Sequence, residues 1–356
     1  MSTLYLTHQY SSVHVMDEVL IVKIPANKTQ GTAAAKRRIP LNKVTQAVVF
    51  GSITLSTQAI AALLASKAEI CYLTRYGKFV ARICGDDHKH GHLRLQQRRA
   101  HDDPTAVLHV AKVCLTAKLH NQRTLLLRSN RERGNPHVAQ AAQDIDAMLT
   151  ALSRLPDTDT PPPDPTRPQE GTVLGQLMGI EGRAAASYFG VFGALFPDKF
   201  GSRFTGRHKR PPTDPINALL SFGYTLLTNQ AVGAAHIVGL DPYVGFLHST
   251  QYGRPAVALD VIEMFRAPIV DSVVLTLLNT RMLDYTDFEE SVGAWRLTDR
   301  GRKVFLEKFE ERMMSEITHP LFKTKVTYRR CIELQMRLLA RWLIGELGRF
   351  RGFHMR

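Results

Sequence analysis

Cysteine is scarce in this sequence, and long apolar runs are missing. Four cysteines stand singly, without a Cys-x-x-Cys pair: Cys71, Cys84, Cys114 and Cys331. This spacing predicts neither a zinc site nor a disulfide framework. No uninterrupted apolar run approaches the ~18 residues that a membrane helix needs. The start, MSTLYLTHQYSS, also lacks the basic and apolar regions of a signal peptide. We therefore expect a protein of the reducing cytoplasm with no membrane partner.

Acidic residues are few relative to basic ones. The 356 residues include 46 Lys and Arg against 32 Asp and Glu, which gives a formal net charge of +14. Such an excess favours a polyanionic partner, either nucleic acid or an anionic membrane surface. The lack of membrane signals weakens the second possibility. With 44% hydrophobic residues, the chain should form a proper core and is long enough for two domains.

The N-terminal part of the chain has the pattern of a small β domain. Short β-branched segments such as SVHVM, VLIVKI and VTQAVVF are separated by turn-forming or polar breaks, which is typical of strands. One helix is expected over residues 58–68, where apolar residues recur at helical spacing. Residues 27–38, NKTQGTAAAKRR, are expected to form a polar, basic hairpin or loop.

The rest of the chain is predicted to be helical. Asp103 and Pro104 form an N-cap signature that opens a long helix. The prolines of residues 156–169 exclude helix and sheet and predict a loop. The expected fold class is α+β, with a small N-terminal β-sheet domain over residues 1–95 and a larger all-helical domain over residues 96–356.

A carboxylate interrupts the apolar face of one predicted helix. In GQLMGIEGRAAASYF, Glu181 shares a helical face with Leu177, Ala184 and Tyr188. An unpaired buried charge is costly, so this side chain needs a cation, a hydrogen-bonding partner or a water-filled cleft. A core glutamate paired with an arginine would meet this need without any function. The glycines of the same helix, each unfavourable in a helix interior, predict that something approaches its backbone closely.

A second group of chemically active residues lies in GFLHSTQYGRPAVALDVIEMFRAPIVD. Asp260 and Glu263, spaced i, i+3, share one face of a short predicted helix, and His248 precedes it in a turn. Alone, such an acid pair is usually a solvated face, and a loop histidine usually has no role. Together with Glu181, they form a mostly oxygen ligand set suited to Mn²⁺ or Mg²⁺. On DNA, such a metal would polarise a phosphate.

Four segments resemble, in this order along the chain, the CRISPR-associated integrase of spacer acquisition, the first-numbered Cas protein: GIEGRAAASYF, RPPTDPINALLSFGYTLL, GFLHSTQYGRPAVALDVIEMFRAPIVD and TYRRCIELQMRLLARWLIGE. The resemblance covers nearly the whole chain and implies a β domain joined to a helical catalytic domain. Carried over by motif, it assigns the metal to Glu181, His248 and Glu263, with Asp260 as the neighbouring catalytic acid. Some members of the family have Asp where Glu263 stands.

The resemblance implies a metal-dependent DNA endonuclease and integrase. Such a protein captures short double-stranded DNA fragments and joins their 3′ hydroxyls to the repeat DNA of a CRISPR array by transesterification, which inserts the fragment as a spacer. The resemblance also implies a homodimer that assembles with a dimer of the small second-numbered Cas protein. Two alternatives stay open: a stand-alone, structure-specific metal nuclease, and a non-catalytic DNA-binding scaffold.

Further polar and basic residues are candidates for holding DNA. Asn217 and Tyr224 belong to a polar stripe on a predicted helix, which either faces solvent or, as the resemblance implies, lines the catalytic cleft. The loop GSRFTGRHKRPP is either solvated or a clamp for a phosphate backbone, with these basic side chains: Arg203, Arg207, Lys209 and Arg210. Arg266, one turn after Glu263, would meet a phosphate or pair with that carboxylate.

Overall fold

The computed structural model describes most of the chain, with short gaps: residues 2–26, 33–85, 90–158, 172–208 and 211–355. The contacts within the chain divide it into two compact units. The first comprises Met1–Asp87 and Asp299–Glu310, and the second comprises His88–Thr298 and Glu311–Arg356. The division into residues 1–95 and 96–356 stays a prediction about the domains. Within the described residues, no helix is long and apolar enough to cross a membrane.

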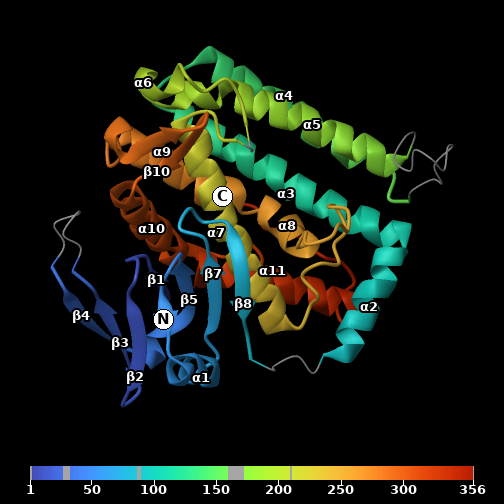
Figure 1. The fold of residues 1–356 in the computed structure, drawn as a ribbon. Helices are drawn as coiled ribbons and strands as arrows, with labels where there is room; N and C mark the ends of the chain where they lie inside the picture. Colours follow the sequence, from blue (N-terminus) through green and yellow to red (C-terminus); the bar gives the residue numbers. More distant parts are fainter. Residues whose placement is uncertain (1, 27–32, 86–89, 159–171, 209–210, 356) are drawn as a thin grey trace. The chain divides into compact units, whose positions relative to one another are not determined.

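The first unit contains two four-stranded sheets (Figure 1). The strand order of one sheet is β1 (Ser2–Leu6), β5 (Val44–Phe50), β7 (Glu69–Leu73) and β8 (Phe79–Ile83), with only the last pair antiparallel. The order of the other is β4 (Ala35–Pro40), β3 (Val19–Ile24), β2 (Ser12–Met16) and β6 (Thr54–Leu55). The β-rich start that the sequence predicted is therefore confirmed.

Residues from both sheets and from one helix bury a common core in this unit. Val22 of β3 and Val49 of β5 belong to the same buried cluster as Leu63 of α1 (Thr57–Ala65). The helix begins where the Ser56 side chain accepts a hydrogen bond from the backbone N–H of Ala59, which satisfies one of the free donors of its first turn.

For the last part of residues 27–38, where a hairpin or loop was expected, the structure shows a hairpin. Ala35–Pro40 is strand β4, which pairs antiparallel with β3 from Val19↔Pro40 to Ile24↔Ala35. The side chains of residues 35–38 are exposed, so this basic edge strand shows no apolar alternation from which it could be recognised. Residues 27–32 lie outside the described residues.

The second unit is mainly helical. Its first helices are α2 (Gly91–Asp102), α3 (Pro104–Asn130), α4 (Pro136–Arg154) and α5 (Val173–Phe192). They are followed by α6 (Asp198–Gly201), α7 (Pro215–Val238), α8 (Ala256–Glu263), α9 (Ser272–Asn279) and α11 (Tyr328–Leu343). Helix α10 (Asp299–Met314) contributes its first part to the other unit. In Figure 1, α4 and α5 lie side by side along α3.

Short two-stranded ribbons interrupt the helices, which the sequence patterns did not predict. Strands β9 (Phe288–Ser291) and β10 (Ala294–Leu297) pair antiparallel, as do β11 (Glu316–Thr318) and β12 (Lys325–Thr327). Val292 and Gly293, between β9 and β10, both have positive φ angles, as a tight two-residue hairpin turn requires. The strands are too short for a visible period of two in the sequence.

The C-terminal tail is fixed to α3 by one buried side chain. Asn121, with no exposed surface, donates hydrogen bonds to the carbonyls of Met264 and Phe353 and accepts one from the N–H of Met355. Gly352 allows this approach, because an added Cβ there would lie 2.9 Å from Ala117 Cβ. The tail therefore covers α3 next to the segment that follows α8.

Replacing Asn121 by Leu should destabilise the protein by about 3 kcal/mol, because it leaves three buried backbone groups without partners. Urea unfolding measures the loss. Gln140→Leu on α4 is a suitable control, since Gln140 is exposed and bonds only to Asp144 within the described chain. A loss no larger for Asn121→Leu than for the control would contradict the role of Asn121.

Candidate active site

Two carboxylates from different helices meet at one ammonium group. Lys118 Nζ lies 2.5 Å from Glu181 Oε1 and 2.9 Å from Glu263 Oε2. Lys118 belongs to α3, Glu181 to α5, and Glu263 is the last residue of α8. The side chains of Glu263 and Lys118 are 3% and 8% exposed, whereas that of Glu181 is 28% exposed. The cluster is therefore buried at Glu263 and opens to solvent at Glu181.

Lys118 is the cation that the position of Glu181 requires, and sequence reasoning did not identify it. It stands in the apolar run VCLTAKLH, where a lysine usually packs its stem on apolar surface and extends its charge into water. The only signal was its place in a helix whose neighbouring residues are almost all buried. The expected close approach to the backbone of α5 is not seen among the described residues, because a Cβ at Gly179, Gly182 or Gly190 would meet nothing within 4 Å.

Asp260 positions His248 and has no free oxygen. Its Oδ2 accepts hydrogen bonds from the backbone N–H groups of Phe246 and Leu247, and its Oδ1 accepts from the N–H of His248. The same Oδ1 lies 2.7 Å from His248 Nδ1. Because a carboxylate only accepts, Nδ1 carries a proton, and Nε2 is the ring nitrogen left for other partners. Nε2 points to the cluster, 3.6 Å from Glu263 Oε1.

The loop before α8 can lie this close because residue 245 is glycine. A Cβ at Gly245 would be 2.6 Å from Ala256 Cβ and 2.9 Å from Asp260 Oδ2, distances that side chains do not tolerate. His248 and Asp260, separated in the sequence by 12 residues, are therefore brought together by the loop and the helix that follows it.

The basic side chains around Glu263 decide its charge. Arg266 Nη1 lies 2.7 Å from Oε1, opposite the contact of Lys118 with Oε2. Burial raises the pKa of the Glu263 carboxyl, but Arg266, Lys118 and His248 outweigh burial and hold this pKa at about 2. Burial likewise opposes the charge on Lys118, yet the two carboxylates overcome it and raise the pKa of the ammonium group. Glu263 and Lys118 are therefore both ionised at neutral pH.

Tyr224 is connected to the carboxylate cluster by its contact with Arg266. The guanidinium of Arg266 lies over the Tyr224 ring, 4.9 Å from its centre, and the Tyr224 hydroxyl donates a 2.6 Å hydrogen bond to Asp271. Asp271 is buried and also accepts a hydrogen bond from Tyr188. Burial raises the pKa of the Asp271 carboxyl despite these bonds. Arg266 and Asp271 are the ends of a π-helical turn, Arg266–Asp271, a feature often found at functional sites.

The Asn217 side chain holds the loop of residues 206–208. Its Oδ1 accepts hydrogen bonds from Arg207 Nη1 and from the backbone N–H of His208, and its Nδ2 donates to Gly206 O. Arg207 also lies over the Tyr224 ring, 5.4 Å from its centre. The side chains of Asn217 and Tyr224 on the polar stripe of α7 are therefore at most half-exposed, and both contact Arg207.

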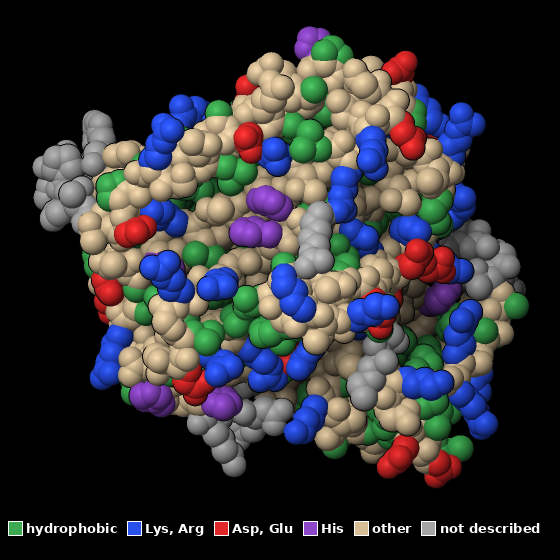
Figure 2. All heavy atoms as spheres, turned by 180° about the vertical axis from the view of Figure 1, so that it is seen from behind, with side chains coloured by type: hydrophobic (Ala, Val, Ile, Leu, Met, Phe, Trp, Pro, Cys, Tyr) green, Lys and Arg blue, Asp and Glu red, His purple; other side chains and the backbone are tan. Residues whose placement is uncertain are grey.

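Of the other candidates for DNA contact, the structure describes some and not others. Arg203 is exposed and its guanidinium lies over the Tyr285 ring, while Lys209 and Arg210 lie outside the described residues. Figure 2 shows Lys and Arg side chains over most of the visible face, without one dominant patch. This distribution agrees with the formal net charge of +14, but it does not select one surface for DNA.

The donor set fits a divalent metal, although the geometry of the structure is that of an ion-pair cluster. Within the described residues, no group of three or more His, Cys, Asp or Glu side chains is arranged to hold a metal ion; the ammonium of Lys118 lies between the two glutamates. Glu263 Oε2 nevertheless is buried and has no hydrogen-bond partner of suitable direction. Donor atoms on neighbouring vertices of an octahedral Mg²⁺ site are about 3 Å apart, close to the 3.6 Å between His248 Nε2 and Glu263 Oε1.

The family described as "CRISPR associated protein Cas1" matches residues 4–311 of this chain. A protein of Moorella thermoacetica named "CRISPR-associated endonuclease Cas1 1" is 34% identical over 362 residues, covering 100% of this chain and 99% of the relative. A Geobacter sulfurreducens protein named "CRISPR-associated exonuclease Cas4/endonuclease Cas1 fusion" is 38% identical over 317 residues. That match covers 88% of this chain, which spans about half (54%) of the fusion protein.

Solved structures share the fold. One described as "Casposase bound to integration product" superposes with a TM-score of 0.83 at 23% identity, covering 99% of this chain and 93% of the other. A chain from a "Cas6-RT-Cas1--Cas2 complex" gives a TM-score of 0.74 at 20% identity, covering 98% of this chain and 36% of the other. At these identities the likeness concerns the fold, and the α+β class predicted from the sequence is confirmed.

The charge balance of Glu263 predicts a pH-dependent stability. Its folded pKa of about 2 lies below the ordinary value of 4.5, so its ionised form stabilises the fold above pH 4.5, and this contribution is lost as the pH falls towards 2. In chelator-treated protein, we expect wild type to be more stable than Glu263→Gln at neutral pH, with a difference that shrinks below pH 4.5. Urea unfolding across this range measures it, and a difference independent of pH would contradict the assignment.

Proposed function

The chain belongs to the Cas1 family, and from this premise we propose that it is a metal-dependent DNA endonuclease and integrase. It captures short DNA fragments and inserts them as spacers into a CRISPR array. The observation that carries the proposal is the convergence of Glu181, His248 and Glu263 from two helices and a loop. Sequence positions so far apart meet at one partly open, ionised cluster, which is the arrangement that phosphoryl chemistry needs.

We propose that Glu181, Glu263 and Nε2 of His248 hold Mn²⁺ or Mg²⁺. When bound, the ion supplies Lewis-acid stabilisation of the charge that develops on a phosphate. Lys118 and Arg266 keep Glu263 ionised and therefore able to bind a cation at all pH values well above 2. Asp260 fixes the ring and the tautomer of His248, so that only Nε2 is left to bind the ion or move a proton.

In the joining reaction, the 3′ hydroxyl of the captured fragment attacks a phosphate of the repeat DNA. The attacking hydroxyl gives up its proton as a new phosphorus–oxygen bond forms, the bond to the repeat's own 3′ oxygen breaks, and that oxygen takes up a proton and leaves as a hydroxyl. The proposal of duplex DNA and repeat DNA as substrates is supported by the related fold that is described as bound to an integration product.

We further propose that the chain acts as a homodimer together with a dimer of the small Cas2 protein. One of the solved structures that share the fold is described as a complex containing Cas1 and Cas2, which supports this choice of partner. Arg203, Arg207 and Arg266 are the described basic residues proposed to contact DNA, with Lys209 and Arg210 in the same loop as Arg207.

An integration assay tests the function. A labelled fragment with free 3′ hydroxyls is mixed with a supercoiled plasmid carrying repeats, with Mn²⁺, Mg²⁺ or chelator and with or without a Cas2 protein. We expect metal-dependent transfer of label, and a loss of at least ~100-fold in Glu181→Ala and Glu263→Ala with salt-sensitive DNA binding retained. Glu132→Ala is the matched control, because Glu132 is exposed and lies at the turn after α3.

The outcomes separate the alternatives. Cutting without joining, even with Cas2 present, would favour a stand-alone nuclease. DNA binding with neither reaction would favour a scaffold, and undiminished joining by Glu263→Ala would remove that residue from the site.

Metal binding can be measured without DNA. Titration with Mn²⁺, followed by electron paramagnetic resonance of the free ion, should show a site that Glu181→Gln weakens at least about tenfold and Glu132→Gln leaves unchanged. Equal affinities of the two variants would contradict the assignment of Glu181 as a ligand.

A further inference from the structure

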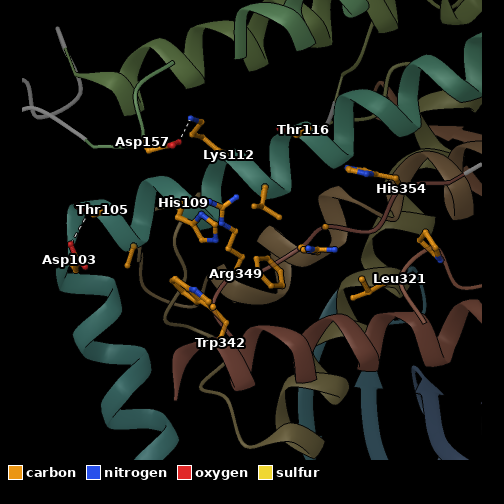
Figure 3. Close-up of a pocket in the computed structure, with 17 residues that line it drawn as sticks. Asp103, Thr105, His109, Lys112, Thr116, Asp157, Leu321, Trp342, Arg349 and His354 are labelled. Atoms are coloured by element: carbon orange, nitrogen blue, oxygen red, sulfur yellow. Dashed lines mark hydrogen bonds and ion pairs between the residues drawn. The ribbon is translucent and has the colours of Figure 1, made fainter. Parts of the chain in front are cut away.

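A cavity lies in the helical unit, away from the carboxylate cluster. It has a volume of about 740 Å³ and is lined by α3, by Trp342 of α11 and by the C-terminal tail (Figure 3). The volume falls in the range of about 300–1,000 Å³ that is usual for small-molecule sites. Thr116 of α3 lines it, and Thr116 and Lys118 are turned by about 200° from one another around the helix. The cavity is therefore on nearly the opposite side of α3 from the glutamates.

The cavity has an excess of uncommitted positive charge. Arg349 and Arg351 are exposed at its wall, and neither guanidinium has an ion-pair partner among the described residues. Lys112, by contrast, is committed to Asp157 Oδ1 at 2.6 Å and to the carbonyl of Leu155 at 2.8 Å. Two arginines are therefore available to an anionic ligand, while of the two carboxylates that line the cavity Asp157 is paired with Lys112 and Asp103 caps α3.

The wall of the same cavity contains aromatic and histidine side chains. His109 packs on Trp342 with ring centres 5.2 Å apart, and Figure 3 shows both beside Arg349. The Nε2 atoms of His109 and His354 are buried without a hydrogen-bond partner, which is unusual for buried polar atoms. Burial lowers the pKa of both rings, so neither ring adds charge to the wall of the cavity at neutral pH.

Arginines for a phosphate and an indole for a base are elements with which proteins bind single strands. A bare phosphate would use the arginines and leave most of the cavity and the aromatic wall unused. We propose that this cavity binds one nucleotide unit of single-stranded DNA, with its phosphate on Arg349 and Arg351 and its base beside Trp342. The choice of a strand over a free nucleotide rests on the proposed function.

Tryptophan fluorescence tests the site directly. The chain has two tryptophans, so Trp295→Phe leaves Trp342 as the single reporter. With chelator present and at low salt, a five-residue thymidine oligonucleotide should quench the emission with saturation. Arg349→Ala in this background should weaken binding about fivefold or more, whereas Arg131→Ala, an exposed arginine at the far end of α3, should leave it unchanged.

Each further result supports or overturns the proposal. Quenching retained in Glu181→Ala would show that the cavity binds the oligonucleotide independently of the carboxylate cluster. A failure of the proposed cavity site can then be told apart from a failure of the proposed integrase function. Strand binding seen by anisotropy of a labelled oligonucleotide, with Trp342 emission unchanged, would overturn the site. Equal effects of Arg349→Ala and Arg131→Ala would do the same. Tighter quenching by thymidine monophosphate or ATP than by the oligonucleotide would overturn the assignment to a strand.

Discussion

Glu263 carries a charge in a nearly water-free position, and the rest of the site is arranged to make this possible. Lys118 approaches one of its oxygens while Arg266 and His248 approach the other. Removing any one partner of such a buried group leaves an uncompensated charge, which is far costlier than the net gain from the intact pair. The relative positions of α3, α8 and the π-helical turn are therefore tied to this single carboxylate.

A surrounding layer of hydrogen bonds fixes the groups that touch the cluster. Asp260 uses both oxygens on the loop of residues 246–248 and so sets the direction of His248. Asp271, held by two tyrosine hydroxyls, anchors the ring of Tyr224 under Arg266. The proposed chemistry on a phosphate would gain from this rigidity, because reorganisation during the reaction is then avoided.

Much of the fold and of the candidate site was readable from local patterns. The N-cap pair Asp103 and Pro104 marked the start of α3, and the i, i+3 spacing of Asp260 and Glu263 placed both on one helix. Lys118 could not be predicted as a site residue, because the sequence of an apolar helix with one lysine is the same whether the ammonium group reaches water or a buried carboxylate. Strand β4 could not be recognised as a strand from its own residues, because its exposed, basic side chains lack the alternation of apolar and polar residues that marks a half-buried strand.

The sequence by itself determined which helices and strands form in most of the chain, the excess of positive charge and the family motifs, because capping, periodicity and composition act over a few neighbouring residues. Only the tertiary structure decided that Glu181 and Glu263 share Lys118, that Asp260 serves His248, and that Arg349 and Arg351 stand at a cavity with Trp342. The contacts of Lys118 with Glu181 and Glu263 join three helices that lie far apart in the sequence. Their geometry depends on how helices pack, which no local pattern encodes.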